Sequence, residues 1–270
     1  MLFKHFINGE FVASASDHTF ENRDPVDNSL IGYVCEAGKS DVDAAVDAAR
    51  KALKGPWGDM TQQGRVKLLN RVADRINERF EEFLAAECRD TGKPRSMASH
   101  IDIPRGAANF NAFSEALANH PTEAFRQDTP DGSGAINYGH RSPKGVIAVI
   151  SPWNLPLLLM TFKVGPALAC GNCVVVKPSE ITPATATLLG QVMNECGVPA
   201  GVYNVVHGFG PNSAGEFLTC HPDVNAITFT GETQTGEIIM RAASVGLRNI
   251  SMECGGKNPA IIFADCDLDN

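Results

Sequence analysis

The stretch MECGG, residues 252–256, places a carboxylate where it could act as a general base. Glu253 follows a short apolar run and precedes two glycines, so we expect it at the end of a strand. A carboxylate in a partly desolvated cleft can have its pKa raised toward neutral pH and then accept a proton from water. A structural ion pair between Glu253 and a lysine or arginine is the alternative, and this segment alone favours neither.

A second candidate lies in SPWNLP, residues 151–156, which follows the strand-like run GVIAVIS. Asn154 is the only amide side chain close to that strand end. It could donate a hydrogen bond to a developing oxyanion, a contact whose removal costs ~3 kcal/mol of barrier. It could equally cap a helix that begins at Pro156, and the spacing leaves both interpretations open.

The segment KPSE, residues 177–180, places a cation, a hydroxyl and a carboxylate at the next strand end. A carboxylate such as Glu180 can accept hydrogen bonds from both hydroxyls of an adenosine ribose and would repel a 2′-phosphate, which favours NAD over NADP. The alternative is a solvated cluster at the entry to a helix, and KPSE taken alone favours that alternative.

Two glycine-bearing segments also stand at strand-to-helix turns. HGFGPNSAG, residues 207–215, departs from the G-x-G-x-x-G spacing and is a weak signal by itself. FTGETQTG, residues 229–236, offers bare backbone amides that can face a phosphate. Glu232 in that segment would repel a pyrophosphate unless it points away or meets a cation.

Each of these loops follows a short apolar run. The runs form a series that begins near Lys144. Helical spacers separate the runs, with boundary signals at Thr182-Pro183, Gly197 and Gly210-Pro211. Continuous apolar strands separated by helices predict an α/β fold with a doubly wound parallel sheet, whose ligands bind at the carboxyl ends of the strands. The expected strands are GVIAVIS, CVVVKPS, VYNVVHG, AITFTG, NISMEC and PAIIFAD.

The first half of the chain is expected to be a hairpin followed by helices. HFINGEFVAS carries a turn signal at Asn8-Gly9 between two apolar stretches. Three helices should follow: one capped by Ser40 over DVDAAVDAARKAL, one from about 62 to 90 that stops at Gly92, and one over 95–120. TPDGSG, residues 129–134, is dense in turn residues and predicts an excursion from the body.

Composition excludes several classes of function. Lys+Arg 23 against Asp+Glu 31 gives a net charge of −8 without a basic block, so we expect no nucleic-acid partner. We expect no membrane partner either, because the longest apolar stretch, residues 155–170, is short and contains Lys163. The eight cysteines lie mostly in apolar runs, as in reduced cytoplasmic proteins, and the Cys170–Cys173 pair lacks the further ligands of a metal site.

Taken together and in this order, SPWN, GPALACGNCVVVKPSE, FTGET and MECGGKNP resemble the NAD(P)-dependent aldehyde dehydrogenase superfamily. The likeness covers essentially the whole chain and implies that family's α/β fold. Within the family, KGPWG, HIDIPRGAANF and FTGETQTG look most like the branch that oxidises 2-hydroxymuconic semialdehyde in aromatic meta-cleavage pathways. The 2-aminomuconic branch is close behind.

The resemblance implies a covalent mechanism in which a cysteine thiolate attacks the aldehyde, a hydride leaves to NAD, and water releases the acid. Asn154 matches the family's oxyanion-stabilising residue and Glu253 its general base, while Lys177 and Glu180 match its ligands for the adenosine ribose. Gly255 matches backbone near the nicotinamide. Further cofactor-lining positions are Trp153, Ser179, Gly210, Phe229, Gly231 and Glu232.

Arg105, in DIPRGAANF, matches an arginine that meets the substrate's carboxylate in the muconic semialdehyde branch. A guanidinium fork suits such a planar anion. The alternative is an ordinary arginine on a helix surface.

Two positions depart from the family pattern, and a third feature bears on activity. Cys254 stands where the family usually has Leu, and we expect it in the core because strand neighbours such as Glu253 and Cys254 point to opposite faces. Glu232 replaces the commoner Ser. The family nucleophile lies beyond Asn270, and the acidic surround of Cys266 should raise a thiol pKa, so Cys266 is a poor substitute.

Two hypotheses of different class follow. The chain is either the cofactor-binding part of a semialdehyde dehydrogenase, inactive by itself, or a stand-alone NAD-binding or interaction module. In the first case the resemblance implies a homo-oligomer. The expected division is 1–121 for the N-terminal hairpin and helices, 122–143 for an oligomerisation excursion, 144–254 for the dinucleotide-binding unit and 255–270 for the start of a catalytic domain.

Overall fold

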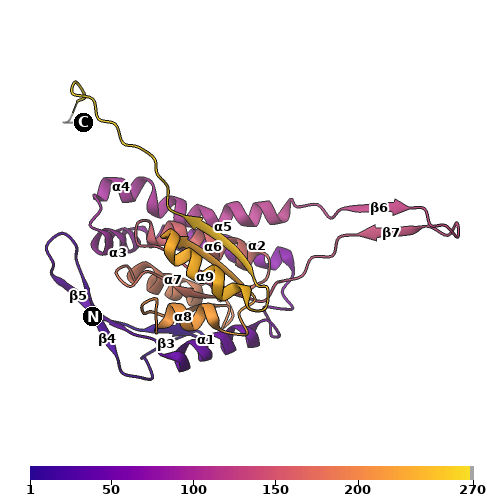
Figure 1. Ribbon diagram of the computed structural model, residues 1–270, viewed down its shortest axis with the longest axis horizontal. Helices are drawn as coiled ribbons and strands as arrows, with labels where there is room; N and C mark the ends of the chain where they lie inside the picture. Colours follow the sequence, from indigo (N-terminus) through magenta and orange to yellow (C-terminus); the bar gives the residue numbers. More distant parts are fainter. Residues whose placement is uncertain (268–270) are drawn as a thin grey trace.

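A central sheet of seven strands organises residues 1–267, the part of the chain that the computed structural model describes (Figure 1). Five of its strands run parallel, and the N-terminal hairpin adds two antiparallel strands at one edge. In spatial order the strands are β12 (Asn249–Cys254), β11 (Ala226–Gly231), β8 (Val146–Ile150), β9 (Cys173–Lys177), β10 (Tyr203–Val205), β2 (His5–Ile7) and β3 (Glu10–Val12).

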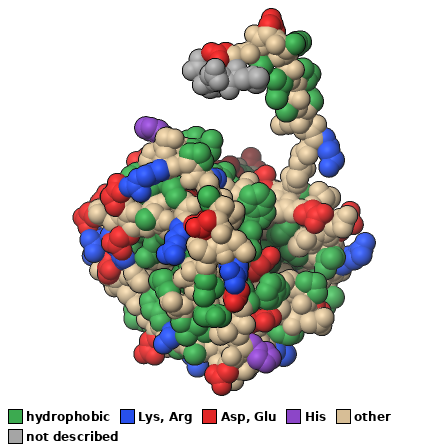
Figure 2. All heavy atoms as spheres, turned by 90° about the vertical axis from the view of Figure 1, so that its left-hand side faces the viewer, with side chains coloured by type: hydrophobic (Ala, Val, Ile, Leu, Met, Phe, Trp, Pro, Cys, Tyr) green, Lys and Arg blue, Asp and Glu red, His purple; other side chains and the backbone are tan. Residues whose placement is uncertain are grey.

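The parallel strands form where the apolar runs predict them. Every residue of β8 and β9 is buried, as expected of strands covered on both faces. The predicted fold class is therefore confirmed. The expected strand in PAIIFAD is wrong, because residues 255–267 contain no strand and Ile261, Ile262 and Phe263 are exposed. Figure 2 shows this segment standing away from the body, so it has no neighbouring strand to pair with.

Helices cover both faces of the sheet. On one side α6 (Pro156–Ala169) and α7 (Ala184–Glu195) pack against the strands, with α2 (Gln62–Glu78) and α5 (Asp102–Ala118) packed outside α6. On the other side lie α1 (Lys39–Ala52), α8 (Ala214–Cys220) and α9 (Thr233–Ser244). Figure 1 shows α5 and α1 at opposite sides of the molecule. The N-terminal helices thus complete the core around the sheet.

Two predicted long helices are each divided. The helix expected from about 62 to 90 breaks at Arg79 into α2 and α3 (Phe80–Thr91), where the Arg79 guanidinium binds Glu195 and Gln191 of α7. The helix expected over 95–120 breaks at Ile101 into α4 (Arg95–His100) and α5. Gly92 ends α3 in the left-handed conformation, as predicted.

The predicted Ser40 cap is wrong. The first helix, α1, begins at Lys39, two residues before the predicted start at Asp41, with Gly38 as its N-cap residue. The Asp41 carboxylate accepts the Gly38 N–H at 2.9 Å and also binds Ser14 and the Ala15 N–H. A carboxylate in the first turn therefore replaces the expected serine hydroxyl.

An edge hairpin of the main sheet and two smaller sheets complete the architecture. The hairpin predicted at Asn8-Gly9 is present as β2–β3. A small sheet contains β1 (Leu2–Phe3), β5 (Leu30–Cys35) and β4 (Thr19–Arg23). The excursion around 129–134 is a hairpin of β6 (Ala124–Gln127) and β7 (Ala135–Tyr138), which projects far from the body in Figure 1.

The strand order has a reversal between β8 and β11. The chain winds outward from β8 through β9 to β10, then returns to the other side of β8 for β11 and β12. In an open α/β sheet the crevice at the carboxyl ends of the strands on either side of such a reversal is the ligand site. The residues that follow β8 and β11 therefore face the expected site.

Of the expected boundaries, 255–270 extends to residues 268–270, which lie outside the described part of the chain. No helix within residues 1–267 combines the length and apolar character needed to cross a membrane.

Candidate functional site

The loop after β8 places Trp153 and Asn154 in solvent at the strand reversal. The N-cap residue of α6 is Leu155, and no side-chain hydrogen bond caps that helix from this position. The alternative role of Asn154 as a helix cap is therefore wrong. Its exposed amide stands at the end of β8 and is free to donate to a ligand.

The loop after β9 holds a buried cation against a half-exposed carboxylate. The Lys177 ammonium donates to Glu180 Oε2 at 3.2 Å, with 7% and 38% of the two side chains exposed. Burial lowers the pKa of Lys177, and the carboxylate of Glu180 partly opposes that shift. Ser179 is also buried, and its carbonyl accepts the Thr182 N–H in the turn toward α7. Because Lys177 is buried, the alternative of a solvated cluster at the entry to a helix is wrong for this residue.

The loops after β8 and β9 are joined by their backbones. The Ser151 N–H donates to the Lys177 carbonyl at 3.3 Å, and Ser151 is itself buried. This contact fixes the start of the Asn154 loop against the end of the strand that carries Lys177. The two predicted groups of site residues therefore belong to one edge of the sheet.

A tight turn follows β10 and leaves Gly210 open to solvent. Gly208 has φ +146°, and a Cβ there would lie 2.8 Å from Ser213 Oγ. The Ser213 hydroxyl accepts the Phe209 N–H at 3.0 Å, which closes the turn. A Cβ on Gly210 would meet nothing within 4 Å. The helix expected to open at Gly210-Pro211 begins later, at Ala214.

The turn after β11 is shaped by the buried ring of Phe229. A Cβ on Gly231 would lie 2.6 Å from Phe229 Cζ, so only glycine fits between this ring and the start of α9. Glu232 is exposed at the N-cap position of α9 and makes no side-chain cap there. Its carbonyl accepts the Gly236 N–H at 3.0 Å. The first turn of α9 therefore faces the strand reversal with its side chains in solvent.

Glu253 is the penultimate residue of β12 and lies on the side of the sheet covered by α6. Its charge raises the pKa of the buried Lys163 on α6, although burial lowers that pKa by more. The Lys163 ammonium donates instead to Thr228 Oγ1 at 3.2 Å. Glu253 is exposed, so the described residues do not form the desolvated cleft expected around it.

Cys254 differs from its prediction in one respect. It points to the opposite face from Glu253, toward α9, because a Cβ on Gly236 would lie 3.0 Å from Cys254 Sγ. The residue is exposed rather than part of the core, since β12 is an edge strand and Cys254 is its last residue. Gly255 is also exposed, and a Cβ there would meet nothing within 4 Å.

Arg105 lies exposed on α5, one layer away from the sheet. Its neighbour Gly106 is buried against α6, where an added Cβ would lie 2.7 Å from Leu157 Cγ. Leu157 is in the first turn of α6, three residues after Asn154. Arg105 therefore lies next to a close contact between α5 and the helix that follows the Asn154 loop.

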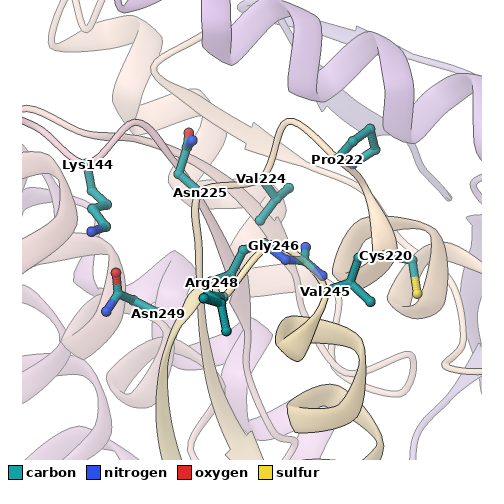
Figure 3. Close-up of a pocket in the computed structure, with 10 residues that line it drawn as sticks. Lys144, Cys220, Pro222, Val224, Asn225, Val245, Gly246, Arg248 and Asn249 are labelled. Atoms are coloured by element: carbon teal, nitrogen blue, oxygen red, sulfur yellow. The ribbon is translucent and has the colours of Figure 1, made fainter.

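A pocket of about 540 Å³ lies at the opposite end of the strands from these loops (Figure 3). Lys144, Asn225 and Asn249, all next to the amino ends of strands, contribute to its lining. In the same cavity the Arg248 guanidinium donates to the carbonyls of His221 and Ala242, at the C-terminal ends of α8 and α9. These contacts satisfy helix carbonyls, so we assign the cavity a structural role and keep the candidate site at the carboxyl edge.

Sequence reasoning missed two groups of buried ionisable residues near the site. His207, just after β10, stacks on His5 of β2 with ring centroids 5.9 Å apart, and burial lowers the pKa values of the two imidazoles to about 3 and about 4. Glu87 and Asp90 of α3 are also buried. The sequence could have indicated their burial, because Leu84, Glu87 and Asp90 follow one another at intervals of three residues on the apolar face of a predicted helix.

No group of three or more His, Cys, Asp or Glu within residues 1–267 is arranged to hold a metal ion. Cys170 is exposed and Cys173 is buried in β9.

Comparison with known proteins gives the class. The family model described as "Aldehyde dehydrogenase family" matches residues 11–270. This match shows that the chain belongs to the aldehyde dehydrogenase family, and the strand order and the loops at the carboxyl edge agree with it.

Particular relatives refine the comparison. The chain is 71% identical over 266 residues to a 2-hydroxymuconic semialdehyde dehydrogenase of Pseudomonas sp. (strain CF600), covering 98% of this chain and 55% of that protein. It is 57% identical over 267 residues to a 2-aminomuconic 6-semialdehyde dehydrogenase of Pseudomonas sp., covering 99% and 54%. The chain thus spans about half the length of the curated relatives it matches.

Solved structures agree on the fold. An NAD+ complex of an aldehyde dehydrogenase from Bacillus cereus superposes with a TM-score of 0.89 at 39% identity, covering 100% of this chain and 54% of that one. A putative aldehyde dehydrogenase from Burkholderia cenocepacia gives a TM-score of 0.91 at 41% identity, covering 99% and 53%.

Proposed function

We propose that this chain provides the cofactor-binding part of an NAD-dependent dehydrogenase that oxidises 2-hydroxymuconic semialdehyde to 2-hydroxymuconate. The observation that carries the proposal is the 71% identity to a 2-hydroxymuconic semialdehyde dehydrogenase over 98% of the chain. The placement of Asn154, Lys177, Glu180 and Glu253 at one edge of the sheet supports it.

The carboxyl edge fits a dinucleotide. Gly231 keeps the backbone bare beside α9, whose first N–H groups can face a pyrophosphate. Lys177 and Glu180 would bind the adenosine ribose, and the carboxylate of Glu180 favours NAD over NADP by repulsion of a 2′-phosphate. Further contacts would come from Trp153, Ser179, Gly210, Phe229, Glu232 and Gly255. Bound NAD would accept a hydride from the substrate.

The chain's own residues have separable roles. The Asn154 amide donates to the oxyanion that develops on the substrate carbonyl. Glu253 accepts a proton from the water that hydrolyses the acyl group, which in this family is held on a cysteine. Arg105 pairs with a carboxylate of the substrate through its guanidinium fork. These roles rest on the resemblance together with the exposed positions of the three side chains.

A chimera provides the direct test. The 270 residues would replace the matching half of the Pseudomonas sp. (strain CF600) relative, and NAD reduction would be measured with 2-hydroxymuconic and 2-aminomuconic semialdehyde. We expect turnover with the first substrate and a loss of about 100-fold or more in Asn154→Ala. Turnover with the second alone would assign the 2-aminomuconic activity instead. Arg105→Ala should raise KM for the anionic substrate, and an unchanged KM would exclude that role.

We further propose a homo-oligomer in the cytoplasm. The β6–β7 hairpin exposes Phe125, Ile136 and Tyr138 far from the body, which suits contact with another subunit. The eight cysteines of the chain are free thiols, as expected in a reducing compartment. Light scattering of wild type and of a hairpin variant, Ile136→Glu, tests the assembly.

A further inference from the structure

Helix α3 carries two buried carboxyl groups that contact the first turns of two other helices. Glu87 and Asp90 are 0% and 4% exposed and, three residues apart, lie on the same face of α3. Glu87 Oε2 accepts the Leu157 N–H of α6 at 3.3 Å. Asp90 Oδ2 accepts the Ala184 N–H of α7 at 2.9 Å.

Neither of these helices caps itself. The N-cap residues are Leu155 for α6 and Pro183 for α7, and neither makes a side-chain cap. The first N–H groups of a helix have no partner within the helix, and leaving one unpaired in a buried place is costly. The two carboxyl groups of α3 therefore provide caps from a distant part of the chain.

Each capped helix follows a loop of the candidate site. Leu157 lies three residues after Asn154, and Ala184 lies four residues after Glu180. A shift of either helix start would move the corresponding loop, because only a short length of chain joins them. The α3 contacts thus bear on the position of both the Asn154 amide and the Glu180 carboxylate.

Helix α3 is itself held in place. Asp90 Oδ1 accepts the Asn22 Nδ2 of β4 at 2.9 Å. Just beyond the end of α3, the Lys93 ammonium lies 2.5 Å from Asp102 Oδ2, at the start of α5. Burial raises the pKa of Glu87 to about 8 and that of Asp90 to about 6, as expected for carboxyl groups enclosed by protein.

We propose that Glu87 and Asp90 are positioning residues, through which α3 fixes the starts of α6 and α7 and hence the separation of Asn154 from Glu180. The functional consequence rests on the proposed function, because that function assigns Asn154 and Glu180 their roles. The two capping contacts do not rest on it. The experiment therefore measures the contacts and their consequence separately.

Amide hydrogen exchange of the 270-residue chain tests the two contacts. Glu87→Met removes one acceptor at similar volume, so exchange of the Leu157 N–H should rise about tenfold while that of Ala184 stays unchanged. Asp90→Leu should give the reverse pattern. Glu87→Gln keeps an acceptor oxygen and should leave both amides near wild type. Glu81→Gln, an exposed change on the same helix, is the matched control.

Unchanged exchange at both amides in Glu87→Met and Asp90→Leu would overturn the proposal. An equal rise at both amides in each variant would also overturn it, because that pattern indicates general destabilisation. Where a variant fails to fold, amide exchange of the wild-type chain decides. A Leu157 or Ala184 N–H that exchanges as fast as an exposed amide would overturn the proposal.

NAD affinity and turnover of the chimera test the consequence. Asp90→Leu should weaken NAD binding about tenfold, and Glu87→Met should lower kcat with little change in KM, because Asn154 acts in the transition state. If exchange changes as expected while NAD affinity and kcat stay at wild-type values, the capping contacts stand but the positioning role is refuted. The proposed function is judged separately, by the two substrates and the Asn154→Ala variant of the chimera.

Discussion

Gly106→Ala on α5 should destabilise the fold through a single close contact with α6. The new Cβ would lie 2.7 Å from Leu157 Cγ and 2.8 Å from Leu157 Cδ2, against an ordinary carbon–carbon separation of about 3.5–4.0 Å. About 1 Å of overlap must therefore be relieved between two buried helices. Overpacking of this kind costs about 1–3 kcal/mol, and the better helix propensity of alanine returns at most about 1 kcal/mol.

Urea unfolding of a double-mutant cycle isolates this contact. In a Leu157→Ala background the two closest atoms are removed and the remaining Cβ of residue 157 lies 3.6 Å from the new methyl group, so Gly106→Ala should become stabilising. The expected coupling energy is therefore about 1–3 kcal/mol. Gly64→Ala on α2 is the matched control, because its new Cβ meets mainly the flexible Met60 side chain. If Gly106→Ala stabilised both wild type and the Leu157→Ala variant as much as Gly64→Ala does, the reasoning would be refuted.

Further predictions concern pH, cofactor and activity. The pKa of Glu87 in the folded chain is about 8, above its ordinary value of 4.5. Its contribution to the free energy of unfolding is therefore fully present below pH 4.5 and is lost as the pH rises to 8. Urea unfolding at several pH values should show this loss in wild type and not in Glu87→Gln. The pKa of His207 in the folded chain is about 3, below its ordinary value of 6.5. Its contribution to the free energy of unfolding is therefore present above pH 6.5 and is lost as the pH falls. In His207→Gln the free energy of unfolding should fall less on acidification, and an equal fall in wild type and variant would contradict the lowered pKa. Glu180→Ala should weaken NAD binding about tenfold and reduce the ratio of the affinity for NAD to that for NADP, both measured by calorimetry. The 270-residue chain by itself should give no aldehyde-dependent NAD reduction, and turnover that disappears in Cys266→Ala would refute this.

The sheet was predictable because its signal is local. The runs at β8 and β9 are continuously apolar, and each ends in polar residues, so both the strands and the site loops can be read from a few neighbouring residues. The failed strand at residues 259–265 shows the limit of this reasoning. Apolar residues form a strand only where a partner strand lies alongside, and sequence alone does not supply the partner.

The α3 carboxyl groups could not be assigned for a related reason. A pattern analysis identifies Glu87 and Asp90 as acids on a helix, but their partners lie 70 and 94 residues further along the chain. The same limit applies to the break at Arg79, where the guanidinium binds Glu195, 116 residues further along the chain. Likewise, the burial of Lys177 became visible only when the strands were assembled.

The pairing of β2 with β10 has a consequence for the order in which the chain can assemble. Phe6 pairs with Val205, so an N-terminal strand closes a sheet whose adjoining strand is made almost two hundred residues later. At synthesis rates of about 5–20 residues per second, the apolar β2–β3 hairpin waits about 10–40 s on the ribosome before its neighbour emerges. During that time the edge of β2 that later pairs with β10 is an unpaired template that other nascent chains can join. Chaperone protection of the first dozen residues would matter more for the yield of this protein than protection of any later strand.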